Sequence, residues 1–293
     1  MIRISKKTLD DLEFDIVLDH IAEQCNTDLG KSKALLLAPF HTIELLHIAL
    51  QEVFEYKSSD LHDTNIPNHG FDNITKEIQL LNIENTFLEA SNLKRIISIS
   101  ITTNELLVFF KKNQETYPFL YQTSSEVIYT KEIINLIEAV IDKFGEVKDN
   151  ASAILLQLRN SINRVQAQLN GSFGKDLTRY HSLGYLDEIK ESVVDNRRVL
   201  AVSAMHRRKV KGAIMGNSKT GSIVYIEPEA TIQFSRELSN LLYEEREEVV
   251  KILKALTNKI RPYIELLKQY QEYLSHVDIV AAKSKFAKQI NAV

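Results

Sequence analysis

A cluster of basic residues between positions 197 and 219 is the feature of this sequence best suited to binding a charged ligand. The 23-residue segment holds seven Lys and Arg residues and no Asp or Glu. The whole chain has a net charge of −3, so the rest of the chain carries −10. Basic side chains attract phosphates, because each neutralised phosphate releases condensed counterions. The segment therefore predicts a nucleic-acid-binding surface made by Arg197, Arg198, Arg207, Arg208, Lys209, Lys211 and Lys219.

Two other interpretations of this basic segment stay open. An acidic protein surface attracts the same side chains as a nucleic acid does. Alternatively, the charges only keep a small exposed sheet soluble. The chain has no Trp, and few aromatic residues lie among the basic ones. Stacking on bases needs aromatic side chains, so we expect contacts to the phosphate backbone instead.

The spacing of the basic residues predicts which of them act together. Neighbouring residues of a strand point to opposite faces. Arg198 should therefore share a face with Leu200 and Val202, while Arg197 shares the other face with Val199. Further along, we expect Arg207 and Arg208 in a loop, followed by Lys209 and Lys211 on one face of the next strand.

No other motif points to a catalytic or metal site. Residues Gly216–Gly221 partly resemble a phosphate-binding loop, but Ser218 stands where that pattern needs Gly before the Lys. The segment is better interpreted as a hairpin loop. The single cysteine, Cys25, excludes an internal disulfide, and the histidines show no metal-ligand spacing. We expect no catalytic residue, no metal and no cofactor in this chain.

Two predicted β-hairpins carry the basic segment. Short β-prone runs at 191–194 and 197–202 are separated by Asp195 and Asn196, which suit a two-residue turn. A second pair, 209–215 and 222–226, surrounds the Gly-rich loop and ends before Pro228.

Two helical segments flank the hairpins and must position them. Apolar residues from Leu155 to Leu169 step alternately by three and four, and the same spacing returns between Leu238 and Leu274. We expect the two helices to be antiparallel partners, because one long amphipathic helix cannot bury its apolar stripe alone. Gly171 and Gly174 should end the first helix. In the second, Glu245 and Lys259 place charge in the apolar stripe, and Pro262 should cause a kink.

The remaining half of the chain predicts an all-α bundle of five to seven helices. A helix should begin near Thr8 and end at Gly30, and others should cover 31–37, 44–57, 88–112 and 131–143. Loops are expected at 58–72 and around Pro118. The acidic run 237–248 is interpreted as the solvated face of a helix, in which early negative charge complements the helix dipole.

Together these patterns predict a mainly α protein in which long antiparallel lever helices carry a small antiparallel β clamp. The expected divisions are a core at 1–148, an outgoing lever at 149–174, the clamp at 175–230 and a returning lever at 231–293. The sequence shows no signal peptide and no apolar run long enough for a membrane span. We therefore expect a cytoplasmic protein that does not bind membranes.

Three stretches of the chain resemble the MutS-II family, the branch of MutS-like proteins outside mismatch repair. They are TLDDLEFDIVLDHIAEQCNTDLGKSKAL near the start, LIEAVIDKFGEVKDNASAILLQLR in mid-chain, and VVDNRRVLAV followed by VKGAIMGNSKTGSIVYIEPEATIQFSREL. The last stretch is the most specific, with Tyr225, Ile226, Glu227 and Pro228 at its centre. It contains the basic segment.

The resemblance implies a clamp that grips DNA, double-stranded or branched, including recombination intermediates. It implies a homodimer in the full-length protein, and it keeps RNA or the ribosome open as a target. Family members carry an ATPase domain, often with a nuclease domain. We expect ATP, Mg²⁺ and both activities to belong to residues outside this chain. The resemblance covers no counterpart of the N-terminal mismatch-reading domain found in repair-type MutS proteins. A coiled-coil scaffold remains the alternative function.

Overall fold

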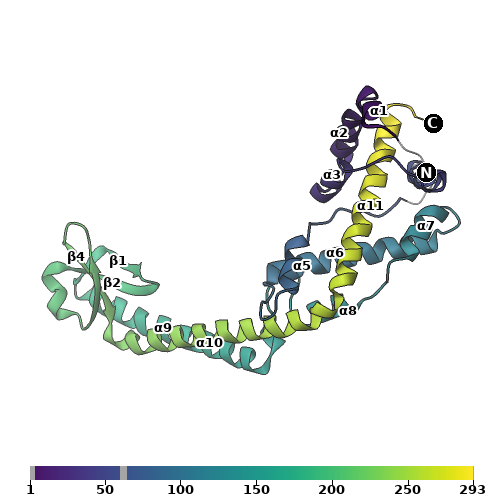
Figure 1. Cartoon of the computed structure of the whole chain (residues 1–293). Helices are drawn as coiled ribbons and strands as arrows, with labels where there is room; N and C mark the ends of the chain where they lie inside the picture. The colour runs from purple at the N-terminus through teal and green to yellow at the C-terminus, as the bar shows by residue number, and fades with distance from the viewer. Residues whose placement is uncertain (1–3, 60–64, 293) are drawn as a thin grey trace. The chain divides into compact units, whose positions relative to one another are not determined.

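The computed structural model describes residues 4–59 and 65–292. Over this range the protein is mainly α-helical, with eleven α-helices and one four-stranded antiparallel sheet (Figure 1). The predicted fold class is confirmed. The chain forms two compact units. The first combines the chain up to Val147 with the segment from Leu253 onwards, and the second is Lys148–Ile252.

The first unit is built only from helices among its described residues, apart from one isolated bridge between Ile141 and Val147. Eight helices precede Val147, one more than the upper limit predicted. They are α1 (Lys6–Asp11), α2 (Phe14–Gln24), α3 (Asp28–Ala34), α4 (Ile43–Ser58), α5 (Thr75–Leu81), α6 (Ala90–Lys112), α7 (Pro118–Ser125) and α8 (Glu132–Glu138). Residues 60–64 of the predicted loop at 58–72 lie outside the described residues.

The region around Pro118 forms a helix, so the predicted loop there is wrong. Proline is favoured in the first helical turn, where its missing N–H needs no partner. The buried carboxylate of Glu55 supplies the cap, because it accepts hydrogen bonds from the backbone N–H groups of Phe119 and Leu120, each at 2.9 Å. Burial raises the pKa of Glu55, and these two hydrogen bonds oppose the rise.

Helix α11 (Ile264–Gln289) organises the first unit and packs against α2, α3, α4, α5 and α6. It follows α10 (Glu229–Ile260) after the short 3₁₀ helix η4 (Arg261–Tyr263). The predicted kink at Pro262 is therefore confirmed as a break between two helices. The Arg261 guanidinium donates to the carbonyl oxygens of Leu81, Ile83 and Thr86, which ties the break to the end of α5.

Asp278 of α11 is fully buried and holds the loop between α2 and α3. Its carboxylate accepts hydrogen bonds from the Asn26 N–H at 2.9 Å, the Thr27 N–H at 3.0 Å and the Thr27 hydroxyl at 2.6 Å. His69 lies 3.5 Å away. Burial alone would raise the pKa of Asp278, but the hydrogen bonds from His69, Thr27 and Asn26 outweigh it and lower the pKa.

Gly30 does not end a helix, contrary to the prediction, but lies inside α3. The break falls at residues 25–27, and Gly30 serves the close approach of α11. A Cβ at this position would stand 2.2 Å from a carboxylate oxygen of Asp278. The glycine is needed because the buried carboxylate leaves no room for a side chain.

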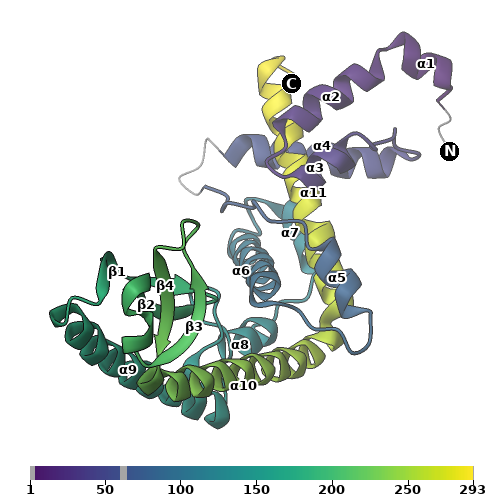
Figure 2. The same cartoon turned by 90° about the vertical axis from the view of Figure 1, so that its left-hand side faces the viewer.

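The second unit begins with the antiparallel helices α9 (Ala153–Ser182) and α10, which lie side by side in Figures 1 and 2. Three contacts fix their direction. Ser152 at the start of α9 donates to Glu248 at 2.7 Å, Arg159 donates to Glu245 at 2.8 Å, and Ser172 donates to the carbonyl oxygen of Ala230. Rising numbers on α9 meet falling numbers on α10. The charge that Glu245 places in the apolar stripe is therefore paired.

The apolar stripe of α9 is buried as predicted, and it continues further than predicted. Leu155, Ile162, Val165 and Leu169 are each at most 8% exposed. Gly171 and Gly174 do not end the helix, which runs on to Ser182. A Cβ at either glycine would meet nothing within 4 Å, so both lie on the open side of the helix. On α10, Leu242 is more exposed than predicted, at 38%.

The four strands form a sheet in the order β1-β2-β4-β3, which the labels in Figure 2 follow across the sheet. Their bounds are β1 (Leu186–Val194), β2 (Arg197–Ser203), β3 (Gly212–Asn217) and β4 (Ile223–Pro228). Both predicted hairpins are confirmed. The two edge strands, β1 and β3, each contain a break in register typical of a β-bulge, between Leu186 and Glu191 and between Ile214 and Gly216.

One face of the sheet packs on the second half of α9. Phe173 and Tyr180 from the helix contact Leu200 and Val202 of β2 and Val224 and Ile226 of β4, and all six are at most 5% exposed. Leu177 packs against the same cluster. The helix that pairs with α10 at its start therefore supports the sheet at its end.

We predict that Asp278→Ala lowers the free energy of unfolding by about 3 kcal/mol or more, because the two buried donors of Thr27 and the part-buried N–H of Asn26 lose their acceptor. The folded-state pKa is lowered, so the ionised carboxylate stabilises the protein above the unfolded pKa of about 3.9 and this stabilisation is lost as pH falls through the folded-state pKa. Asp278→Asn should therefore show a smaller loss of stability between pH 6 and pH 3. Urea denaturation at each pH measures both effects. An unchanged acid dependence in Asp278→Asn would contradict the assignment.

Candidate nucleic-acid interface

The turn between β1 and β2 presents the start of the basic segment. Asp195 and Asn196 both have positive φ, 49° and 59°, as a two-residue turn of type I′ requires. The turn fixes the register in which Val194 pairs with Arg197 and Val193 with Arg198. The turn thus places both arginines at the first two positions of β2, a strand that lies between β1 and β4.

Arg198 is engaged within the protein. Its guanidinium donates to Glu191 at 2.6 Å and to Asn170 at 2.9 Å, and it lies 4.3 Å from the ring centroid of Phe173. The side chain thus covers the apolar cluster beneath the sheet. The predicted sharing of a face with Leu200 and Val202 is confirmed, because these two residues belong to the same cluster.

Arg197 is engaged on the opposite side of the sheet. It donates to Glu227 of β4 at 2.8 Å. The Glu227 side chain is only 1% exposed, whereas that of Arg197 is 34% exposed. The second carboxylate oxygen of Glu227 has no hydrogen-bond partner among the described residues. Arg197 therefore compensates a buried negative charge, which limits its availability to a phosphate.

The remaining five basic residues are exposed. Arg207, Arg208 and Lys209 lie in a 3₁₀ helix, η3 (Ala204–Lys209), between β2 and β3. The prediction that Lys209 and Lys211 lie on one face of the following strand is wrong for both residues, since β3 begins only at Gly212. None of the five forms an ion pair with a carboxylate among the described residues. They are Arg207, Arg208, Lys209, Lys211 and Lys219.

An aromatic stack supports η3, and no motif of the sequence indicates it. The rings of Tyr185 and His206 lie 4.9 Å apart, and the ring of Tyr180 lies 6.3 Å from Tyr185. The Lys209 ammonium stands 5.2 Å from the centre of the Tyr185 ring. These residues come from α9, the following loop and η3, so only the fold brings them together.

The loop between β3 and β4 is a hairpin loop, as predicted. The Ser218 N–H donates to the carbonyl oxygen of Ile223 at 2.9 Å, and the Gly221 N–H donates to the carbonyl oxygen of Ser218. Gly221 has a φ of 72°, a conformation that favours glycine. Lys219 is exposed in this loop.

Gly212, where β3 begins, needs to be glycine. A Cβ there would stand 2.0 Å from the carbonyl oxygen of Glu227 on β4. The close approach of these two backbones sets where β3 starts after η3.

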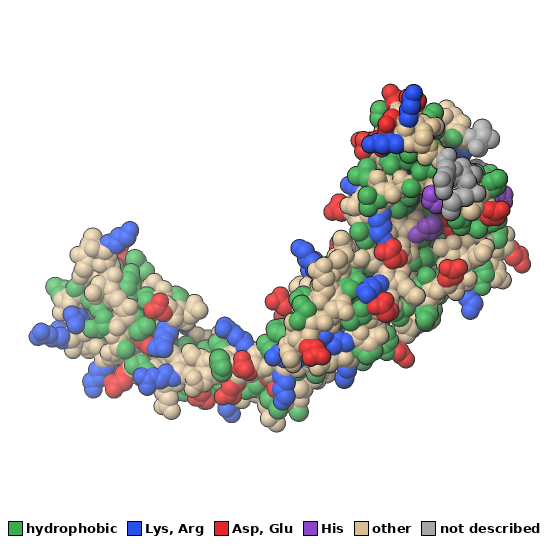
Figure 3. Space-filling model, viewed as in Figure 1, with side chains coloured by type: hydrophobic (Ala, Val, Ile, Leu, Met, Phe, Trp, Pro, Cys, Tyr) green, Lys and Arg blue, Asp and Glu red, His purple; other side chains and the backbone are tan. Residues whose placement is uncertain are grey.

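On the face drawn in Figure 3, several Lys and Arg side chains (blue) stand out from the sheet end of the second unit. Two acidic residues of α10 bind groups of the protein itself. Glu245 and Glu248, which were predicted to lie on a solvated face, bind Arg159 of α9 and its N-cap residue Ser152. That part of the prediction is wrong for these two residues.

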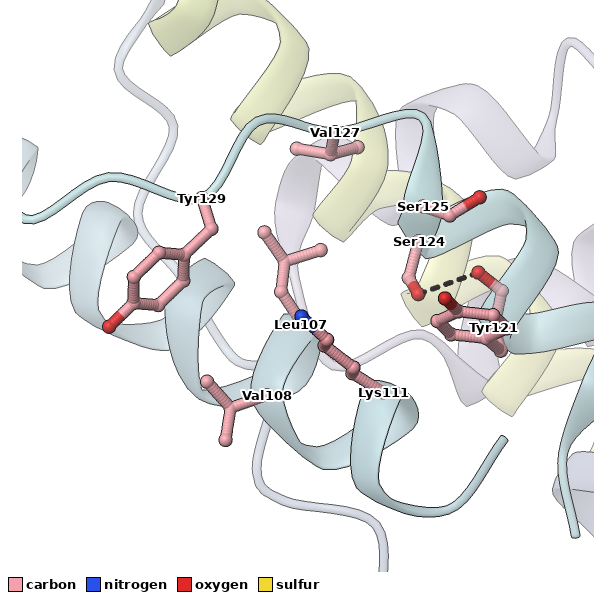
Figure 4. A pocket seen from close by; sticks show the side chains of 8 residues that line it. All are labelled: Leu107, Val108, Lys111, Tyr121, Ser124, Ser125, Val127 and Tyr129. Carbon is pink, nitrogen blue, oxygen red and sulfur yellow. Dashed lines mark hydrogen bonds between the residues drawn. The ribbon is translucent and has the colours of Figure 1, made fainter. Parts of the chain in front are cut away.

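Other features of the molecule give little support for a catalytic or metal site. A cavity of about 350 Å³ in the first unit is lined by Leu107, Val108, Lys111, Tyr121, Ser124, Ser125, Val127 and Tyr129 (Figure 4). The Ser124 hydroxyl donates to the carbonyl oxygen of Tyr121 instead of pointing toward a general base. Burial raises the pKa of the Cys25 thiol to about 12, so the thiol stays protonated. The described residues contain no group of three or more potential metal ligands.

The fold and the site define a class of protein: a mainly α-helical chain in which antiparallel helices support a small sheet with exposed basic residues. No protein-family model matches the chain. Within the described residues, no helix is long and apolar enough to cross a membrane.

Curated proteins named Endonuclease MutS2 are similar to 99% of the chain. The identity is 26% over 295 residues with the protein of Leuconostoc mesenteroides, 24% over 292 residues with that of Alkaliphilus oremlandii, and 28% over 295 residues with that of Carboxydothermus hydrogenoformans. The chain spans 37% of the length of each of these relatives. The similarity supports a relationship to MutS proteins.

We predict that Arg197→Ala destabilises the second unit, because Glu227 is left buried without its partner. The loss should be about 2–3 kcal/mol, below the about 3–5 kcal/mol of a fully buried pair because Arg197 is one-third exposed. Arg207→Ala is the matched control, and we expect a change within about 0.5 kcal/mol. Urea denaturation monitored by circular dichroism measures both. Equal stability of the two variants would show that the Arg197–Glu227 pair is not structural.

Proposed function

We propose that this chain is the nucleic-acid-holding part of a MutS-like protein and that it grips the phosphate backbone of double-stranded or branched DNA. One observation carries the proposal: five exposed cations, which have no carboxylate partner among the described residues, lie on η3 and in the loops before and after β3. The relatives are named endonucleases, and an endonuclease is an enzyme that acts on nucleic acid. The two lines of support are independent.

The division of the seven basic residues refines the proposed contact surface. Arg197 and Arg198 bind carboxylates of the protein itself. The phosphate contacts are therefore assigned to Arg207, Arg208, Lys209, Lys211 and Lys219. Contacts to phosphate carry no base information, so the binding is proposed to be independent of sequence.

The wider interpretation follows from the resemblance to the MutS-II family. In it, the first unit, which includes α11, is the core; α9 and the part of α10 in the second unit are the lever; and the four-stranded sheet with η3 is the clamp. ATP binding, nuclease activity and homodimer formation are proposed for the full-length protein. The relatives are much longer than this chain, which spans 37% of their length. Two clamps in such a dimer would hold two arms of a branched DNA.

The binding should depend strongly on salt. Four or five phosphate contacts predict a slope of about −4 for the logarithm of affinity against the logarithm of salt concentration. Fluorescence anisotropy with a labelled duplex and a labelled four-way junction, at several salt concentrations, measures the slope. A flat response would refute phosphate-backbone binding.

A triple substitution tests the residue assignment. Arg207→Glu, Arg208→Glu and Lys211→Glu together should weaken DNA binding at low salt by at least about tenfold and flatten the slope. The matched control reverses three exposed lysines of the first unit, Lys76, Lys111 and Lys112, and should change the affinity little.

The same variants separate the alternative functions. If the triple variant binds DNA as the unaltered chain does but loses a protein contact, the basic surface belongs to a scaffold with an acidic protein partner. If single-stranded or ribosomal RNA binds more tightly than any DNA, the target is RNA.

A further inference from the structure

Met205 is an exposed apolar side chain on η3, the short helix that also carries three of the five exposed basic residues. It is 81% exposed, as exposed as Leu36 and more than any other large hydrophobic residue described. Single exposed hydrophobic residues are common on proteins and need no explanation by themselves. The position of Met205 is unusual because Arg207 and Arg208 follow it within one turn of η3.

The 3₁₀ geometry fixes the direction in which Met205 points. Side chains three residues apart are eclipsed in this helix, so η3 has three rows. His206 and Lys209 form one row, and both lie against Tyr185, at 4.9 Å and 5.2 Å from its ring centre. Met205 and Arg208 form another row, which is turned away from that contact and is exposed.

The short helix is held at both of its ends. The Ser203 N–H donates to the carbonyl oxygen of Tyr185 at 3.1 Å, and the Ala204 N–H donates to that of Ser222 at 2.9 Å. After η3, Val210 is 6% exposed and belongs to the cluster between the sheet and α9. Met205 thus stands on a backbone that is fixed to the sheet on either side.

We propose that Met205 is an apolar wedge that inserts between neighbouring base pairs of DNA while the flanking arginines bind the phosphates. The inference rests on the function proposed above. Proteins that kink DNA use Met, Leu or Phe in this way, beside basic residues that hold the backbone. The unbranched, polarisable methionine side chain adapts to the irregular gap of an opened step.

The wedge predicts a substrate class. Opening a base step costs stacking energy, and this cost is lowest where stacking is already interrupted. Nicked duplexes and junctions should therefore be bound more tightly than intact duplexes of the same length and charge. Phosphate contacts alone would not distinguish a nicked from an intact duplex, because both carry nearly the same charge.

The test uses the whole chain with three labelled DNAs: an intact duplex, the same duplex with a nick, and a four-way junction. Each DNA carries 2-aminopurine, a base whose fluorescence rises when it is unstacked. The base stands next to the nick, at the branch point, or at the matching position of the intact duplex. We expect the nicked duplex to bind at least about fivefold more tightly than the intact one, with a rise in fluorescence on binding.

Met205→Ala should abolish both the preference for the nick and the fluorescence rise, while the salt dependence is unchanged. Met205→Leu should keep both. Leu36→Ala is the matched control, because Leu36 is equally exposed but lies in the first unit, and it should change neither. Thermal unfolding of each variant confirms that the fold is intact.

The outcomes separate the two proposals. If Met205→Ala binds with the full preference for the nick and the full fluorescence rise, the wedge is refuted, while salt-dependent gripping of phosphates stands. If the unaltered chain binds intact and nicked duplexes equally, the wedge is likewise refuted. If no DNA binds in a salt-dependent manner, the proposed function itself is wrong.

Discussion

The packing of α9 against one face of the sheet is the interaction on which the arrangement of the second unit depends. A sheet with one apolar face must bury that face against another element, and here that element is α9. Phe173 and Tyr180 supply the helix side of this contact. The same cluster includes Val210, which directly follows η3. The burial of apolar side chains beneath the sheet therefore also determines where the exposed cations are held.

Ion pairing divides the basic residues into two groups with different physical roles. The arginines in β2 have strand neighbours on both sides, and carboxylates from those neighbours lie within reach at Glu191 and Glu227. A buried carboxylate without a cation would be costly, so these arginines are part of the fold. Within the described part of the chain, the basic residues of η3 and the loops form no ion pair with a carboxylate. Their charge is left to face solvent or a ligand.

The spacing of apolar residues predicts much of this fold. The sequence does not show which residues become neighbours in three dimensions. The alternating spacing after Leu155 predicted α9, and Asp195 with Asn196 predicted the first hairpin. The glycines of α9 were misjudged because an exposed glycine costs a helix only about 1 kcal/mol, which the packing of a long helix outweighs. Gly30 was misjudged because its reason is Asp278, distant in sequence. The partners of Arg197 and Arg198 depend on strand register, so the sequence predicted seven available cations where five are exposed without ion pairs among the described residues.

The bulges in β1 and β3 have a consequence for how copies of this protein can meet. An open sheet with straight outer strands offers rows of unpaired N–H and C=O groups, to which a strand of another molecule can add. Here the register is interrupted on both outer strands, and Lys190 adopts a left-handed conformation within the interruption on β1. Such irregular borders discourage strand addition and fibre growth. If many copies were bound side by side along one polymer, their sheets would not pair with one another.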